Sequence, residues 1–126
     1  LLTSADLSLD EAVEGVHALG GLAIPAHVDR KAFSLIANLG FVPAGINVDA
    51  LEISRHLSPE EACDRYPQLR EYPLVQNGDA HRLDELLGVN LARLEAPTVA
   101  ELALALREEG GRSLAIRTLP PRRLSP

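Results

Sequence analysis

Apolar residues recur at intervals of three to four positions near the start of the chain, which is the spacing of an amphipathic helix. Ser8 and Glu11 have the spacing of a capping box, and Gly20 and Gly21 suit the end of a helix. We therefore predict a helix over residues 8–20. Its apolar stripe comprises Leu9, Ala12, Val13, Val16 and Leu19.

Short apolar runs alternate with helical patterns along the rest of the chain. The runs at residues 22–26, 48–53, 73–76 and 90–95 are short enough for strands, and helices are predicted over 32–39, 58–66 and 99–109. Such alternation is typical of an α/β fold with a largely parallel sheet and flanking helices. The expected core contains Leu22, Ile24, Leu51, Ile53, Leu74 and Val75, together with Val13 and Val16.

The chain of 126 residues is long enough for one domain, which we place at residues 1–118. Residues 119–126 contain three prolines and are expected to form a flexible tail. No apolar run approaches the length of a membrane span, and a cytoplasmic location is expected. The chain begins with Leu1 and shows no secretory leader pattern, so we expect a cut at its start.

Charge and cysteine content narrow the possible functions. The formal net charge is −6 and the basic residues are scattered, which argues against extended binding to a nucleic-acid backbone. The single cysteine, Cys63, excludes an internal disulfide and is expected to be a buried, inert thiol on a helix face.

Polar residues follow three of the predicted strands. His27 follows the first, residues 54–56 follow the second, and Asp79 and His81 follow the third. Because the carboxyl ends of parallel strands meet at one edge of a sheet, these side chains are expected to converge. Imidazole and carboxylate ligands together suit zinc, manganese or iron. On an extended backbone, Asp79 and His81 would point to the same side.

Three segments resemble the C-terminal half of the PHP (polymerase and histidinol phosphatase) domain family. They are residues 16–30 (VHALGGLAIPAHVDR), 48–54 (VDALEIS) and 77–84 (NGDAHRLD). The resemblance implies that His27, Asp79 and His81 are metal ligands. It also implies a distorted (β/α)7 barrel that holds up to three divalent ions and hydrolyses phosphate mono- or diesters.

The chain departs from the common pattern of that family at two single positions and in one missing motif. Val28 follows the histidine where proline is usual, and Gly78 precedes the aspartate where serine is usual. The family's N-terminal His-x-His has no counterpart, since no histidine lies upstream of Ser8. We therefore expect a missing N-terminal segment of the same protein, or a separate chain, to supply further ligands. The isolated chain is expected to bind metal weakly, to hydrolyse esters poorly and to form homodimers through an exposed sheet edge.

The resemblance also suggests roles in catalysis. Asp79 and Arg30 are the candidate catalytic residues, and Arg30 and Arg55 are candidates for binding the phosphate of a phosphorylated small molecule or nucleotide. Surface salt bridges are the alternative role for both arginines. Glu52 lies inside a strand and is expected to pack or pair rather than bind metal.

Each candidate ligand has a simpler alternative. His27 would then bond to backbone at a strand end, and Asp79 and His81 would be solvated loop residues. His17 is expected to be structural, and His56 to lead into the next helix cap. The corresponding alternative function is a non-catalytic α/β module of the same fold that binds a partner or regulates a larger enzyme.

Overall fold

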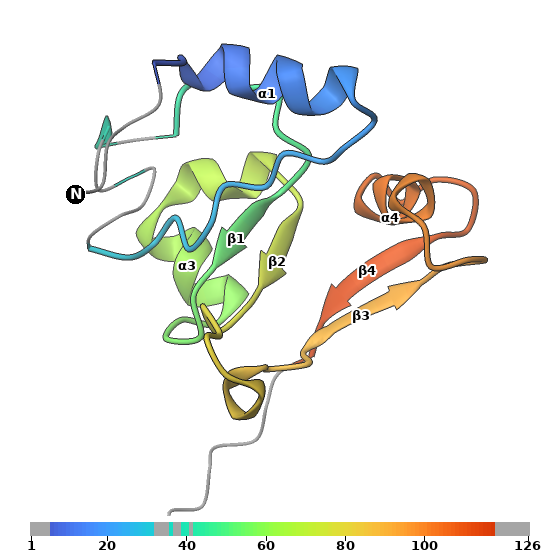
Figure 1. The fold of residues 1–126 in the computed structure, drawn as a ribbon. Helices are drawn as coiled ribbons and strands as arrows, with labels where there is room; N and C mark the ends of the chain where they lie inside the picture. Colours follow the sequence, from blue (N-terminus) through green and yellow to red (C-terminus); the bar gives the residue numbers. More distant parts are fainter. Residues whose placement is uncertain (1–5, 32–35, 37–38, 41, 118–126) are drawn as a thin grey trace, which may run out of the picture.

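The computed structural model describes residues 6–31, 36, 39–40 and 42–117. The helix predicted over 32–39 and the tail over 119–126 lie largely or wholly outside this part of the chain. The elements are α1 (Leu9–Ala18), β1 (Leu51–Ile53), α3 (Pro59–Arg65), a 3-10 helix (Pro67–Glu71), β2 (Leu74–Gln76), a second 3-10 helix (Leu83–Glu85), β3 (Asn90–Arg93), α4 (Val99–Leu106) and β4 (Ser113–Ile116) (Figure 1).

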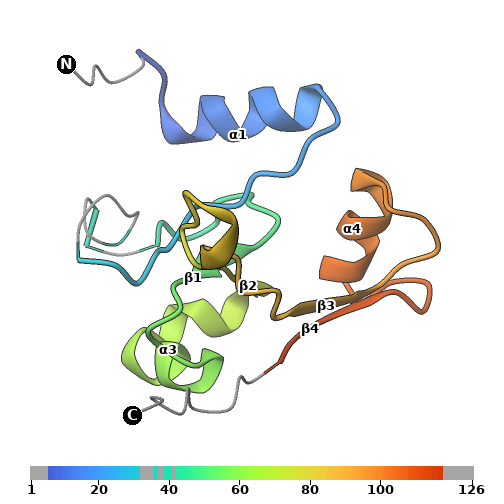
Figure 2. The same ribbon diagram turned by 60° about the horizontal axis from the view of Figure 1, so that its bottom comes forward.

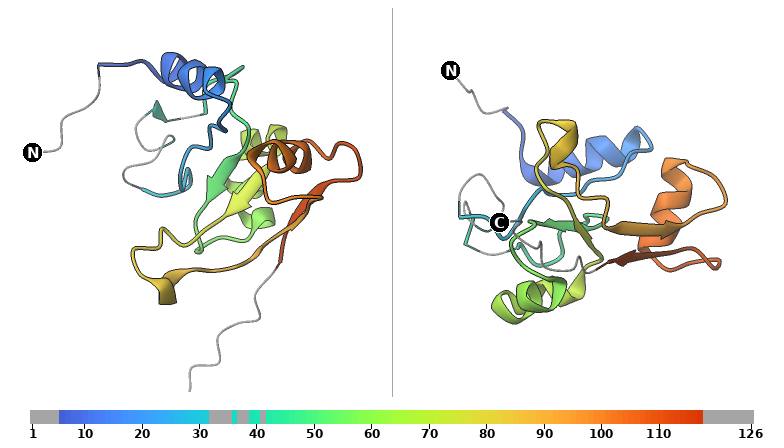
Figure 3. Two further views of the ribbon diagram at one scale, coloured as in Figure 1. Left: turned by 45° about the vertical axis from the view of Figure 1, so that its right-hand side comes forward. Right: turned by 90° about the horizontal axis from the view of Figure 1, so that it is seen from below.

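The strands form two separate pairs. β1 and β2 are parallel, with Leu51 opposite Leu74, whereas β3 and β4 are antiparallel, with Asn90 opposite Ile116. The β1–β2 pair lies between α1 and α3, and α4 lies against the β3–β4 pair (Figures 2 and 3). The fold is therefore mixed α/β. The expectation of a largely parallel sheet is wrong for the second pair, and neither pair closes into a barrel within the described residues.

The chain reverses immediately after α4. Glu108, Gly110 and Gly111 have φ values of 55°, 58° and 77°, which place all three in the left-handed region. Such a run turns the backbone sharply, so the chain returns along β3 and does not cross over to a parallel position.

Arg112 holds this reversal in place. Its guanidinium donates hydrogen bonds of 2.8 and 2.9 Å to Glu101 in the first turn of α4, and it lies 2.7 Å from the carboxylate of Glu95, which follows β3. The start of β4 is thereby kept beside the end of β3, which requires an antiparallel pair.

The predicted strand at residues 22–26 is not a regular strand, although it runs alongside β1 (Figure 1). The Asp49 amide donates to the carbonyl of Ala23 at 2.9 Å, and the Glu52 amide donates to the carbonyl of Pro25 at 3.0 Å. Because Pro25 has no N–H, it cannot donate in return, and the ladder is broken at that position.

The helix cap predicted at Ser8 is confirmed, and α3 begins with an equivalent cap. The Ser8 hydroxyl accepts from the Glu11 amide at 3.2 Å and the Glu11 carboxylate accepts from the Ser8 amide at 2.8 Å. Ser58 and Glu61 form the same reciprocal pair with the same distances. These local patterns need no tertiary contact, which is why the sequence identifies them.

Two clusters of buried residues form the core. The larger one contains Leu51, Ile53 and Leu69, all fully buried, and the half-buried Cys63 packs against it. The smaller one joins Val75 on β2 to Leu106 on α4. Within the described residues, the helices are too short or too polar to span a lipid bilayer.

Most of the predicted core is confirmed. Val13, Leu51, Ile53 and Val75 are buried and Leu22, Ile24 and Leu74 are half-buried, but Val16 is 37% exposed. Val16 lies in the last turn of α1, two residues before the helix ends at Ala18, and the chain turns at Gly20.

Replacing Leu51 by alanine is expected to lower the free energy of unfolding by about 2–5 kcal/mol, because the side chain is fully buried. Chemical denaturation measures this loss. The matched control is Leu91→Ala on β3, where the side chain is 52% exposed and the change should stay within about 0.5 kcal/mol. Equal losses in the two variants would contradict the assignment of the core.

Glu101 is expected to titrate far below its ordinary value. Its hydrogen bonds from Arg112, reinforced by the amide of Glu95, lower the pKa from 4.5 to about 2. Its contribution to stability is therefore complete above pH 4.5 and is lost as the pH falls through about 2. Carboxyl ¹³C NMR titration measures this pKa, and Arg112→Ala should return it towards 4.5. A normal pKa in the unaltered chain would contradict the ion pair.

Candidate metal centre

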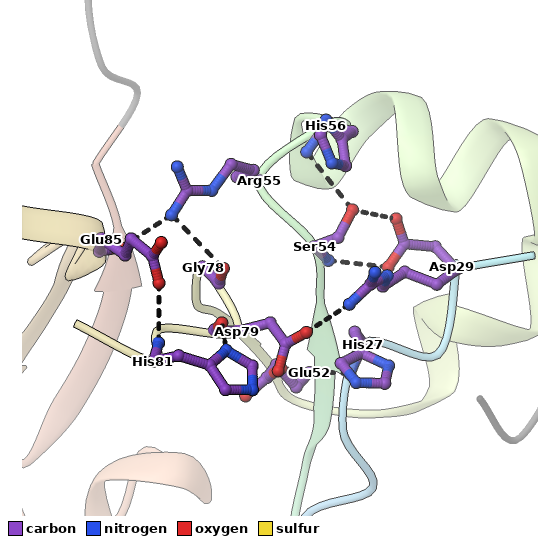
Figure 4. Close-up of polar contacts among 11 residues, drawn as sticks. His27, Asp29, Glu52, Ser54, Arg55, His56, Gly78, Asp79, His81 and Glu85 are labelled. Atoms are coloured by element: carbon purple, nitrogen blue, oxygen red, sulfur yellow. Dashed lines mark hydrogen bonds and ion pairs between the residues drawn. The ribbon is translucent and has the colours of Figure 1, made fainter. Parts of the chain in front are cut away.

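Polar side chains gather beyond the carboxyl ends of β1 and β2. His27 ends the segment that runs alongside β1, Ser54 follows β1 directly, and Asp79 and His81 follow β2 (Figure 4). This is the end of the sheet at which the sequence predicted a functional site.

His27 bulges out of the backbone pairing with β1. The carbonyl of Glu52 accepts from the Val28 amide at 2.8 Å, one residue later than regular parallel pairing requires, while the His27 amide donates to the Glu52 carboxylate at 3.1 Å. His27 has a φ of 32°, in the left-handed region that a residue with a side chain rarely occupies. Such backbone is retained where the surrounding contacts impose it, and it occurs often at functional sites.

The imidazole of His27 has a nitrogen without a partner. Among the described residues, Nδ1 of His27 is the only buried side-chain nitrogen or oxygen without a hydrogen bond. Leaving such an atom unpaired costs about 1–3 kcal/mol. An imidazole nitrogen in this position fits a metal ligand, because a bound ion would accept its lone pair.

Asp79 has a φ of 52° and pairs with Arg30. The hydrogen bond from Arg30 lowers the pKa of the Asp79 carboxyl; partial burial opposes this shift, and the charges of Arg30, His27 and His81 add to it. Asp79 is therefore a carboxylate at neutral pH, which is the form that binds metal.

His81 presents a defined nitrogen to the site. Its Nδ1 lies 2.8 Å from the carbonyl oxygen of Asp79, which can only accept, so Nδ1 carries a proton and Nε2 is the nitrogen that could bind a metal in the neutral ring. Metal-binding histidines are commonly oriented by such a bond. The His81 amide donates to the Glu85 carboxylate at 2.7 Å, which holds the loop.

The imidazoles of His27 and His81 lie on either side of Asp79. Figure 4 shows the Asp79 carboxylate between the imidazoles of His27 and His81, close enough for both rings to affect its pKa. Because the φ of Asp79 is positive, the backbone there is not extended, and the extended geometry expected for Asp79 and His81 is wrong. Arg30 holds one carboxylate oxygen, and the described residues contain no set of three ligands arranged around one point.

Asp29 fastens the loop that carries His27 and Arg30. Its carboxylate accepts from the Ser54 amide at 2.7 Å and from the Ser54 hydroxyl at 2.6 Å, and Ser54 is buried at the end of β1. This role of Asp29 was not predicted from the sequence. The available signal was a carboxylate two residues after the predicted ligand.

Arg55 holds the second loop and does not point towards the three ligands (Figure 4). Its Nη2 donates to the carbonyl of Glu85 at 2.7 Å and to that of Gly78 at 3.3 Å. The observed contacts of Arg55 are therefore to backbone carbonyls, and its contact with a phosphate stays a prediction. A Cβ on Gly78 would lie 2.7 Å from the Glu85 carbonyl and would overlap the Arg55 guanidinium, so the loop requires glycine there.

Gln76 and Asn90 hold the start of the loop that follows β2 and carries Asp79. The Asn90 side chain accepts from the Gln76 amide and donates to the Gln76 carbonyl, both at 2.9 Å, and so extends β2 as a short strand would. The Gln76 side chain donates to the carbonyls of Ser54 and Leu57. Neither residue was predicted from the sequence, because neither belongs to a recognisable motif.

The other histidines lie outside this cluster. His17 bonds to Asp49 at 2.8 Å and ties α1 to the residues before β1, in agreement with its expected structural role. The His56 amide donates to the Ser54 hydroxyl, and Figure 4 shows its ring pointing away from Asp79. A surface pocket of about 310 Å³ lies at the opposite end of β2, next to Pro73 and Leu114, and is not part of the candidate centre.

Comparison with protein families, curated proteins and solved structures found no match to this chain.

Replacing Gly78 by alanine is expected to lower the free energy of unfolding by about 1–3 kcal/mol, because the added Cβ would press on the Glu85 carbonyl. Chemical denaturation measures the loss. Gly15 lies inside α1 with nothing within 4 Å of an added Cβ, so Gly15→Ala should instead stabilise the chain by about 0.5–1 kcal/mol. A neutral result for Gly78→Ala would contradict the close approach of the two loops.

Proposed function

We propose that this chain contributes His27, Asp79 and His81 to the metal site of a PHP-like phosphoesterase. The observation that carries the proposal is the unpaired, buried Nδ1 of His27, which lies in the same cluster as a carboxylate and a correctly oriented imidazole. Two imidazoles and a carboxylate suit zinc, manganese or iron.

The outer contacts of these residues support the proposal. The His27 amide is held by Glu52, the His81 ring by the Asp79 carbonyl, and the His81 amide by Glu85. Bonds of this kind orient ligands before an ion arrives, which reduces the cost of ordering them. Three protein ligands leave coordination positions for water, substrate and ligands from other segments, as a catalytic site needs.

A divalent ion held here would lower the pKa of a bound water and polarise a phosphoryl oxygen. The Arg30 side chain is 43% exposed and reaches the Asp79 carboxylate, which places it beside the position that a phosphate would take. A phosphate ester accepts two parallel hydrogen bonds from arginine, which would orient it for attack and stabilise the charge that develops. The proposed substrate is a phosphorylated small molecule or nucleotide.

The proposal includes a larger architecture. β1, β2 and the segment beside β1 would belong to a distorted (β/α)7 barrel, and further strands and ligands would come from another segment or a second chain. The parallel register of β1 and β2 is compatible with this arrangement.

A second candidate function is a non-catalytic α/β module that binds a partner or regulates a larger enzyme. The ion pair between Arg30 and Asp79 favours this function, because it satisfies the carboxylate without a metal. Under this alternative the cluster holds the loops together, and its integrity affects stability only.

Metal titration separates the two functions. Isothermal titration calorimetry with Zn²⁺ or Mn²⁺ is expected to show loose binding to the 126-residue chain. Asp79→Asn should weaken it by about tenfold or more, because the charged ligand is lost. His56→Ala is the matched control, since this ring points away from the cluster.

Arg30→Ala is expected to change metal affinity in the opposite direction from Asp79→Asn. It releases the Asp79 carboxylate from its ion pair, so metal affinity should rise while turnover of a chromogenic phosphodiester should fall. The absence of metal binding in the unaltered chain, with effects of Asp79→Asn on stability alone, would support the non-catalytic module.

A further inference from the structure

Glu52 lies between the two loops that carry the candidate ligands. Its neighbours Leu51 and Ile53 point into the core and are fully buried, so alternation along β1 directs the Glu52 side chain to the opposite face. It is half-buried there, beside His27 and Asp79 (Figure 4).

One carboxylate joins both loops. Oε1 of Glu52 accepts from the His27 amide at 3.1 Å, and Oε2 accepts from the Asn77 side-chain amide at 2.8 Å. The loop with His27 enters from the segment on one side of β1, whereas Asn77 follows β2 on the other side. Asn77 is two residues before Asp79, so Glu52 sets the separation of ligands from different parts of the chain.

The hydrogen bonds that link Asn90, Asn77 and Glu52 all donate towards Glu52. The Asn90 side chain donates to the oxygen of the Asn77 amide at 3.1 Å, which turns the Asn77 nitrogen towards Glu52. Glu52 therefore faces a donor at each oxygen. A carboxylate meets this requirement fully, whereas a glutamine would place its own NH₂ against one of the two donors.

We infer that Glu52 is a positioning residue for the metal centre: its carboxylate fixes the bulge at His27 and the Asn77 loop in the arrangement that binds the ion. This inference rests on the proposed function, since it assigns Glu52 a role in metal affinity. Glu52 acts through His27 and Asp79 and does not itself bind the ion.

The experiment compares Glu52→Gln with Asp49→Asn. The Asp49 carboxylate ties the same segment to the chain at its other end, where it accepts from the Ala23 amide at 2.7 Å and from His17 at 2.8 Å. The control thus removes the charge of an acceptor that holds the same segment, without touching the ligand loops.

Without metal, amide hydrogen exchange followed by NMR reports the link directly. Glu52→Gln is expected to make the His27 amide exchange about tenfold faster or more, because it loses a charged acceptor. Asp49→Asn should leave the His27 amide unchanged and should accelerate the Ala23 amide. Unchanged exchange of His27 in Glu52→Gln would overturn the structural basis of the inference.

With metal, Co²⁺ and Zn²⁺ titrations measure affinity, and the visible spectrum of Co²⁺ reports the ligand arrangement. Glu52→Gln is expected to weaken binding by about 10–100-fold and to alter the spectrum, while Asp49→Asn lowers the melting temperature alone. Equal affinity in the unaltered chain and Glu52→Gln, or equal losses in both variants, would overturn the inference. No Co²⁺ or Zn²⁺ binding by the unaltered chain would overturn the proposed function, and with it the role of Glu52 in metal affinity.

Discussion

β1 makes backbone hydrogen bonds along both of its edges, and the other parts of the candidate centre take their positions from it. The Leu51 amide donates to the carbonyl of Pro73, just before β2, while Glu52 pairs with Pro25 and Val28 on the other side. Full burial of Leu51 and Ile53 anchors the strand in the core, which leaves Glu52 and Ser54 to organise the loops at its end. Three residues of regular strand thus determine where two distant segments meet.

Beyond the ends of the strands, carboxylates hold the loops by accepting hydrogen bonds from backbone amides. Asp29 holds the Ser54 amide, Glu52 the His27 amide and Glu85 the His81 amide. Each bond involves a charged acceptor and is stronger than an ordinary amide pair, so short loops can adopt unusual backbone. This arrangement supports the positive φ values of His27 and Asp79 without glycine at either position.

Local patterns made several features predictable from the sequence alone. The caps at Ser8 and Ser58 depend on residues three positions apart, and the alternation at Leu51 and Ile53 identifies a buried strand face. The position of His27 and Asp79 after apolar runs was enough to predict that they approach each other, because parallel neighbours end at the same edge.

Long-range contacts decided the rest. The sequence determined the mixed α/β class, the helix starts and the polar residues that gather at the carboxyl ends of the strands. Only the tertiary structure decided that Arg112 turns β4 antiparallel to β3, that Arg30 pairs with Asp79 and that Glu52 joins the two loops. The physical reason is separation along the chain. Each of these contacts joins residues much more than one helical turn apart, so neither periodicity nor spacing predicts them. The charged side chains come within bonding distance only because the folded core places their segments side by side.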